Sequence, residues 1–410
     1  MNLKLRLTIM QFLEFFVWGC WLITIGNYWF QTKGWSGSEF GIIFATMGIS
    51  SLFMPALMGI VADRWMNAEK LFAILHLLGG LALLCIPQID NPVTFFWGIL
   101  VAMIFYMPTI ALANSISYTV LKKGNYDVVK NFPSIRVFGT VGFIVAMWIV
   151  NLTGNKGSAN QFYIASAAAF LLGFYAFTLP KCAPLGNSKE RKSLIQILGL
   201  DAFELFKQKK MALFFIFSML LGAALQLTNA YGDVYLDDFK RIPEYAHSFV
   251  VKYSTIIMSI SQMSETLFIL AIPFFMKRFG IKNVMLMSFT AWVLRFGLFG
   301  FGNPTDGLWM IILSCIVYGM AFDFFNISGS MFVETTVAPS MRSSAQGLFM
   351  MMSNGVGAIL GGSISGFVIQ HYFTAADGMK NWHSIWLAFA TYALVVGILF
   401  ALCFREKKGN

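Results

Sequence analysis

The chain has 410 residues, of which 58% are hydrophobic and 12% are charged, with a formal net charge of +10. Soluble domains carry about 25% charged residues, so the composition excludes a soluble enzyme, a disulfide-rich secreted domain and a disordered chain. Lipid is therefore the expected solvent for most of the surface, and the sequence predicts an all-α membrane protein.

The first apolar run covers about residues 7–30 and follows a short basic segment. It is longer than the apolar region of a signal peptide, lacks a small-residue cleavage site and contains Glu14. We therefore expect this run to be retained as the first membrane span.

Further apolar runs along the chain are also long enough to cross a bilayer. Because the backbone must satisfy its own hydrogen bonds in lipid, each run is predicted to be a helix. Together they predict twelve transmembrane helices in two six-helix bundles. The later runs cover 38–62, 70–88, 94–120, 134–153, 159–180, 210–232, 248–276, 281–301, 308–330, 342–370 and 382–404.

The predicted domains follow from this division. Residues 1–180 form the N-terminal bundle and 210–404 the C-terminal bundle. Residues 181–209 form a basic cytoplasmic linker with an amphipathic surface helix over 193–206, and 405–410 form a cytoplasmic tail.

Lysine and arginine predict the orientation, because cytoplasmic loops are enriched in them. With both termini in the cytoplasm, most of the 29 Lys and Arg residues lie on cytoplasmic loops and ends. The exceptions on the opposite side are Lys33, Lys156, Lys240, Arg241, Lys252 and Lys380. The basic charge is thus a topology signal, with anionic lipid headgroups rather than nucleic acid as its partner.

Cysteine and histidine give no sign of a metal site or a cofactor. The five cysteines form no CxxC pair, all but Cys182 lie in apolar runs, and the four histidines have no zinc-site spacing. We expect neither a metal nor another cofactor.

Five ionisable residues stand out inside predicted spans, where a charge needs a partner or a function. Ion pairing between helices is the structural alternative, and for Arg295 it is at least as good an explanation as function. Arg136 lies about one turn inside its predicted span, near the cytoplasmic rim. The five residues are Glu14, Arg136, Glu265, Arg295 and Asp323.

Several spans carry a short polar or aromatic stripe at helical spacing. Single amides often join membrane helices, but repeated stripes at mid-span depth predict a wet cavity between the two halves. Amides and carboxylates bind hydroxyls, and aromatic faces stack on planar rings, so the ligand expected is a small neutral polyhydroxylated molecule. The stripes are Arg136, Thr140 and Phe143; Gln226 and Asn229; Gln262 and Glu265; and Tyr318 and Phe322 with Asp323.

A carboxyl group in such a cavity can take up a proton on one side of the membrane and release it on the other. Glu265, Asp323 and Glu14 are the candidates for proton coupling. Their spacing alone does not rank them.

The segment after the second predicted span contains Gly59, Asp63 and Arg64 in the order G-x-x-x-D-R. At this place in a two-halved chain, it resembles the signature of the major facilitator superfamily. The resemblance implies alternating access between two bundles and a role for Asp63 and Arg64 in latching the cytoplasmic gate.

Longer segments resemble the bacterial nucleoside:proton symporter family. The resemblance implies proton-driven nucleoside uptake across the inner membrane, by a transporter that is not an enzyme and that we expect to be a monomer. It also implies ligand contacts at the stripe residues named above. The segments are residues 53–63, 132–143, 198–203, 259–266 and 318–330.

Two features depart from that family. Glu14 stands at a position where one branch carries Gln and another Glu, so it adds a titratable group or alters the preference for the base. Asp233, Asp237 and Asp238 also make the predicted loop after the seventh span more acidic than expected.

Three alternatives remain open at this point. An oligosaccharide:proton symporter has a similar fold and also uses membrane carboxylates. An intramembrane nucleoside hydrolase or transferase would need a paired-carboxylate loop, a metal set or a nucleophile elbow, and the sequence offers none. A nucleoside sensor would need an output domain, whereas six residues follow Phe404.

Overall fold

The structure is a computed structural model that describes residues 2–184, 200–338 and 341–404. Apart from turns and an isolated bridge between Thr374 and Lys380, these residues form helices. Among them, nine helices are long and apolar enough to cross a membrane. The predicted helical membrane architecture is confirmed, whereas the count of twelve spans stays a prediction.

The chain divides into two compact units, here called unit 1 and unit 2. Unit 1 is Met1–Trp35 with Ile49–Ser193, and unit 2 is Ser36–Gly48 with Leu194–Asn410. The helix α3 (Gly37–Arg64) begins in unit 2 and ends in unit 1.

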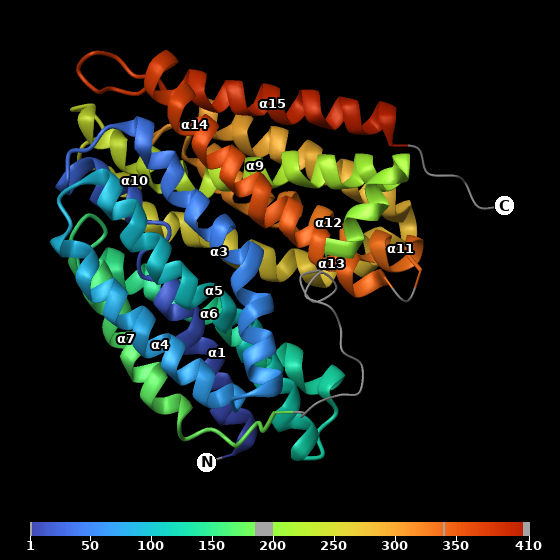
Figure 1. Ribbon diagram of the computed structural model, residues 1–410. Coiled ribbons are helices and arrows are strands. Elements are labelled where there is room, and N and C mark those ends of the chain that lie inside the picture. Colours follow the sequence, from blue (N-terminus) through green and yellow to red (C-terminus); the bar gives the residue numbers. More distant parts are fainter. Residues whose placement is uncertain (1, 185–199, 339–340, 405–410) are drawn as a thin grey trace. The chain divides into compact units, whose positions relative to one another are not determined.

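Unit 1 is built around α1, which packs on α5, α6 and α7, while α4 packs on α5 and α7 (Figure 1). The first predicted span is interrupted by turns at residues 20–24. The elements are α1 (Leu3–Gly19), α2 (Ile25–Asn27), the π-helix η1 (Tyr28–Thr32), α4 (Ala68–Cys85), the 3-10 helix η2 (Ile86–Gln88), α5 (Pro92–Lys123), α6 (Val128–Leu152) and α7 (Asn160–Ala176).

Helix α6 begins earlier than its apolar run, which changes the position of Arg136. The Asp127 side chain accepts a hydrogen bond from the Lys130 backbone N–H and caps the helix at Val128. Arg136 therefore lies more than two turns from the helix start, deeper than the sequence prediction of one turn.

Unit 2 is centred on α11, which packs on α12 and α15, while α9 packs on η6 and α14. Its elements are the 3-10 helix η3 (Leu200–Lys207), α9 (Lys209–Asp238), the 3-10 helix η4 (Phe239–Arg241), α10 (Phe249–Lys252), α11 (Ser254–Phe301), α12 (Leu308–Thr336), α13 (Arg342–Met350), the π-helix η6 (Met351–Gly357), α14 (Ala358–Tyr372) and α15 (Trp382–Cys403).

Of the predicted linker, 181–209, the structure describes residues 181–184 and those from 200 onward. Of the predicted amphipathic helix 193–206, residues 193–199 lie outside the described residues, and the remainder belongs to η3 rather than to an α-helix. The predicted tail, 405–410, also lies outside the described residues.

Helix α11 contains the predicted span 248–276 from residue 254 onward and the whole of 281–301, with no loop between them. Gly280 interrupts the helical backbone with φ 76° and ψ 167°. Such a positive φ is accessible to glycine at no steric cost. One residue therefore makes the turn that the sequence assigned to a short connection.

Helices α11 and α12 approach each other closely at Gly319. A Cβ atom there would lie 2.6 Å from the carbonyl carbon of Ser264 and 2.7 Å from the backbone nitrogen of Glu265. Both neighbours are backbone atoms, which cannot rotate away as a side chain can. Glycine at 319 thus fixes the position of the segment that carries Glu265.

We expect Gly319→Ala to lower the free energy of unfolding by about 1–3 kcal/mol, because an added methyl forces the two backbones apart. Thermal unfolding of the purified protein in detergent measures this. Gly297→Ala, within α11, is the matched control, since no atom lies within 4 Å of its added Cβ. Equal melting temperatures for the two variants would contradict the prediction.

Candidate functional site

The predicted ligand residues of unit 2 lie on α9, α11 and α12, and those of α11 and α12 come together. Tyr318 and Asp323 are buried in α12, and both lie close enough to Glu265 of α11 to interact with it electrostatically. Gln226 is buried in α9, and Gln262 lies one turn before Glu265. That the i, i+3 and i, i+4 stripes face a ligand stays a prediction.

Three buried oxygens in this group lack a hydrogen-bond partner among the described residues. They are Gln226 Oε1, Gln262 Oε1 and Asp323 Oδ2. A buried acceptor left unsatisfied costs about 1–3 kcal/mol, so native structures rarely leave several together. All three are acceptors, which suits a ligand that presents hydroxyl or N–H donors.

Arg295 is fully buried and is held by neutral groups from three helices. Its Nη1 donates to the Ser314 carbonyl at 2.8 Å, and its Nε donates to Thr228 Oγ1 at 3.2 Å. The guanidinium also lies 4.6 Å from the centroid of the Tyr318 ring. These hydrogen bonds favour a positioning role for Arg295, in which it orients Tyr318.

Aromatic rings line the same region of unit 2. Tyr318 and Phe322 are stacked, with centroids 6.1 Å apart and planes 9° apart. Trp292 meets Tyr318 edge-on at 6.0 Å. The pair of parallel faces could stack on a planar heteroaromatic ring.

In unit 1, the stripe on α6 faces aromatic residues of α1. The Arg136 guanidinium lies 4.1 Å from the Phe15 ring centroid. Phe143 is buried and meets Trp18 edge-on at 6.2 Å. Thr140, on the same face of α6, is half-buried. Aromatic residues of α1 therefore pack against the predicted stripe.

Glu14 is fully buried and lies in a hydrogen-bonded group of its own. Its Oε2 is 2.7 Å from His76 Nε2 of α4, and its Oε1 accepts from Thr109 Oγ1 of α5 at 2.7 Å. The Tyr106 hydroxyl donates to the Glu14 carbonyl oxygen at 2.8 Å. The sequence did not predict these partners, because they lie on two other spans and His76 is a single histidine within an apolar run.

The motif residues Asp63 and Arg64 are exposed at the end of α3. Their position at a helix end agrees with the expected loop. Their gating role stays a prediction.

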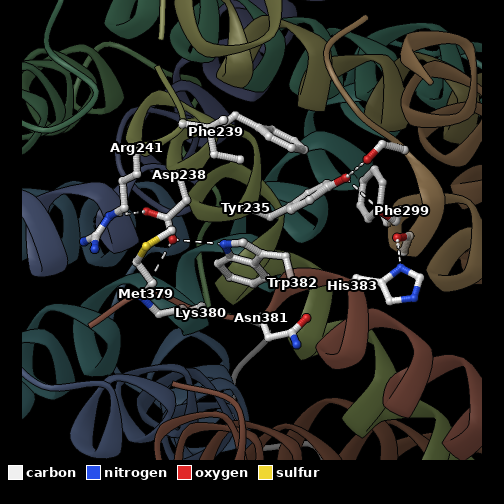
Figure 2. Close-up of a pocket in the computed structure, with 13 residues that line it drawn as sticks. Tyr235, Asp238, Phe239, Arg241, Phe299, Met379, Lys380, Asn381, Trp382 and His383 are labelled. Carbon is white, nitrogen blue, oxygen red and sulfur yellow. Dashed lines mark hydrogen bonds and ion pairs between the residues drawn. The ribbon is translucent and has the colours of Figure 1, made fainter. Parts of the chain in front are cut away.

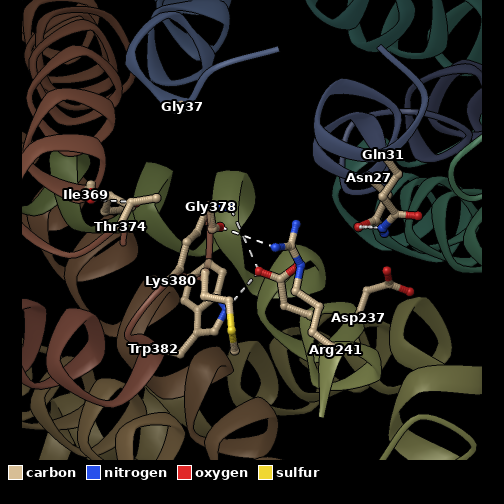
Figure 3. Close-up of polar contacts among 12 residues, drawn as sticks. Asn27, Gln31, Gly37, Asp237, Arg241, Ile369, Thr374, Gly378, Lys380 and Trp382 are labelled. Atoms are coloured by element: carbon tan, nitrogen blue, oxygen red, sulfur yellow. Dashed lines mark hydrogen bonds and ion pairs between the residues drawn. The ribbon is translucent and has the colours of Figure 1, made fainter. Parts of the chain in front are cut away.

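A separate cavity of about 240 Å³ lies at the end of α9, lined partly by Asp238, Arg241 and Lys380 (Figure 2). Asp238 accepts from Trp382 Nε1 at 3.0 Å and lies 3.8 Å from Lys380 Nζ. Arg241 extends toward Gly378 and Asp238 (Figure 3). These contacts tie the end of α9 to the segment before α15.

The acidic residues assigned to a loop after the seventh span are instead helical. Asp233, Asp237 and Asp238 lie in the last turns of α9, which continues past the predicted end at 232. Thr255 Oγ1 donates to Asp233 at 3.0 Å, and Lys240 pairs with Asp237 at 2.7 Å. The helix extends because these partners satisfy its carboxylates.

Lys380 is 4% exposed and lies outside the membrane-spanning helices. Burial lowers the pKa of Lys380; the Asp238 carboxylate raises it in part, and Arg241 lowers it further. Asp238 is thus a carboxylate partner that stabilises the buried ammonium.

We expect Asp238→Asn to lower the free energy of unfolding at neutral pH by about 3 kcal/mol, because it removes a carboxylate partner of a buried charge. The loss of unfolding free energy relative to the parent should become smaller as the pH rises. A lysine whose folded-state pKa is depressed penalises folding below that pKa, and the penalty is lost once it deprotonates. Thermal unfolding across pH measures both effects. Asp306→Asn, at an exposed site, is the control; equal stability of the two variants would refute the prediction.

Comparisons with known proteins agree along the whole chain. The model of the "Nucleoside H+ symporter" family matches residues 1–409. The chain is 52% identical to the xanthosine permease of Escherichia coli (strain K12) over 99% of this chain and 96% of that protein. It is 50% identical to the nucleoside permease NupG of the same organism, over 99% of this chain and 97% of that protein.

The fold agrees as well. A crystal structure of nucleoside transporter NupG superposes with a TM-score of 0.93 at 50% identity, covering 99% of this chain and 100% of that chain. A D323A mutant of that transporter gives a TM-score of 0.96, covering 98% of this chain and 100% of that chain. These matches confirm the predicted major facilitator-type fold and a transporter rather than an enzyme. The chain belongs to the nucleoside H+ symporter family of membrane transporters.

Proposed function

We propose that the stripe residues form the nucleoside site of this symporter and that Glu265 and Asp323 carry the coupled proton. The observation that carries the proposal is the set of three buried acceptor oxygens without partners, on Gln226, Gln262 and Asp323. Each belongs to a residue that the spacing had already selected. Ribose hydroxyls are donors that would satisfy them.

The aromatic residues support a place for the base. Stacked Tyr318 and Phe322 present parallel faces beside the acceptor group, and offset stacking on a heteroaromatic ring is favourable. Asn229 in α9 adds an amide one turn after Gln226. In unit 1, we propose that Arg136, Thr140 and Phe143 contribute contacts from α6.

Glu265 and Asp323 are suited to proton coupling because they repel each other when both are ionised. One proton on the pair removes that repulsion, and its release restores it. At a membrane potential of 100 mV, each proton that enters gains about 2.3 kcal/mol. We propose that the protonated pair permits closure around bound nucleoside.

Transport by alternating access fits a chain of two bundles, which we place at 1–180 and 210–404. The Lys and Arg distribution supports cytoplasmic termini in the bacterial inner membrane. Exposed Leu267, Leu270 and Phe274 on α11 suit contact with lipid. We propose a monomer in which Asp63 and Arg64 help to latch the cytoplasmic gate.

The similar proteins are a xanthosine permease and a nucleoside permease, so xanthosine and other nucleosides are the substrates to test. A panel of purine nucleosides, including xanthosine, and pyrimidine nucleosides should raise the melting temperature of the purified protein, since a ligand that binds only the folded state stabilises it. Free ribose or a disaccharide competing as strongly as a nucleoside would favour the oligosaccharide alternative.

We expect Asp323→Asn and Glu265→Gln each to abolish nucleoside accumulation in vesicles with an imposed proton gradient, because neither neutral amide can carry the proton. Uptake of radiolabelled nucleoside, with and without an ionophore, measures this. Asp306→Asn and Glu204→Gln, the same changes at exposed sites, should accumulate nucleoside as the parent does. Normal accumulation by both site variants would rule out the assignment.

A further inference from the structure

Glu14 lies among polar partners that are arranged for two protonation states. Thr109 Oγ1 is 2.7 Å from Glu14 Oε1 and 2.6 Å from the Tyr106 carbonyl oxygen. A hydroxyl has one hydrogen and can also accept a hydrogen bond. It therefore cannot donate to both oxygens at once, and the choice depends on Glu14.

When Glu14 is ionised, the Thr109 hydroxyl donates to Oε1 and His76 Nε2–H donates to Oε2. When a proton is added to Oε1, the carboxylic acid donates to Thr109, whose own hydrogen turns to the Tyr106 carbonyl. The His76 contact at 2.7 Å persists in both states. No buried polar atom loses its partner, so the usual cost of changing a buried charge's hydrogen bonds is avoided.

The charged and titratable groups around Glu14 are few. His76 faces it from α4, and Tyr106 donates to its carbonyl from α5. Arg136 of α6 acts electrostatically on Tyr106, as do Glu14 and Cys20 of α1. Helix α7, which also packs on α1, has no charged residue. His76 is thus the titratable side chain in direct contact with the carboxyl group.

The same turn of α1 touches the proposed ligand face. Phe15, next to Glu14, lies under the Arg136 guanidinium at 4.1 Å. Trp18, one turn further, meets both Tyr106 at 5.6 Å and Phe143 at 6.2 Å. A change in the charge at Glu14 therefore acts on residues that position Arg136 and Phe143.

We propose that Glu14 and His76 form a second proton-binding pair in unit 1, separate from Glu265 and Asp323, and that its protonation positions α1 against the nucleoside-contacting face of α6. The proton enters from the outer side with the nucleoside, resides on Glu14 Oε1, and leaves to the cytoplasm when nucleoside is released. This inference rests on the proposed function. Glu14 and His76 are positioning residues, because they act through Phe15 and Trp18.

The test measures protons taken up per nucleoside bound, by titration calorimetry in two buffers of different ionisation heat. The pH dependence of nucleoside affinity comes from the same samples. In Glu14→Gln the amide retains a donor for Thr109 and an acceptor for His76, but cannot titrate. We expect its proton uptake to fall below that of the parent. We also expect the midpoint of the pH dependence of nucleoside affinity to shift by at least about one pH unit in this variant, which is a tenfold change in proton affinity.

His76→Gln should shift the profile in the same direction, and the double variant should shift it no further, because both residues act on the one proton held by Glu14. Glu69→Gln is the matched control: Glu69 is also buried in α4, but it accepts from the Cys182 backbone N–H at the end of unit 1. Its pH profile should follow the parent's. If His76→Gln does not fold, as judged by melting without ligand, Glu14→Gln decides alone.

The possible outcomes separate the two proposals. A parent protein that binds no nucleoside refutes the proposed function. A parent that binds nucleoside with proton uptake, together with a Glu14→Gln variant of identical uptake and pH profile, refutes only the present inference. Loss of all proton uptake in Asp323→Asn would overturn it too, because no proton would remain for Glu14.

Discussion

Inside a membrane, a polar group that finds no partner within the protein finds none in the lipid, and this constraint governs the whole structure. Most buried polar groups here obey it locally: Ser314 and Arg295 exchange hydrogen bonds with each other's carbonyl oxygens. The exceptions are therefore informative. Atoms of Gln226, Gln262 and Asp323 that have no partner among the described residues fall on three helices, one of which, α12, also carries the stacked aromatic pair.

The buried carboxylates show two solutions to the same problem. Glu14 receives a full set of hydrogen bonds from α4 and α5. Asp323 has one oxygen without a partner among the described residues and lies near a second carboxylate. The first arrangement keeps each polar atom of the group paired in both charge states, as a positioning pair requires. The second is relieved by binding a ligand or a proton, which is the behaviour expected of a coupling site.

Hydropathy predicted the helical fold well, because long apolar runs in lipid leave the backbone no alternative to helix. Spacing also predicted that Tyr318 and Phe322 share a face, and the two rings do stack, whereas Asp323 was selected by its charge inside a span. Helix ends were less predictable: α6 starts early through the Asp127 cap, and α9 runs on because Asp233 and Asp237 find partners. The partners of Glu14 were beyond prediction, since they depend on how separate spans pack side by side.

The break at Gly280 has a mechanical consequence. It joins the segment bearing Glu265 to the segment bearing Arg295 through a single residue with φ 76°. Because one residue connects them, the two helical segments can change the angle between them but cannot separate. A change of angle at Gly280 would move the segment bearing Glu265 relative to the segment bearing Arg295, whose guanidinium contacts Tyr318. A one-residue connection therefore couples the movements of two neighbouring helical segments.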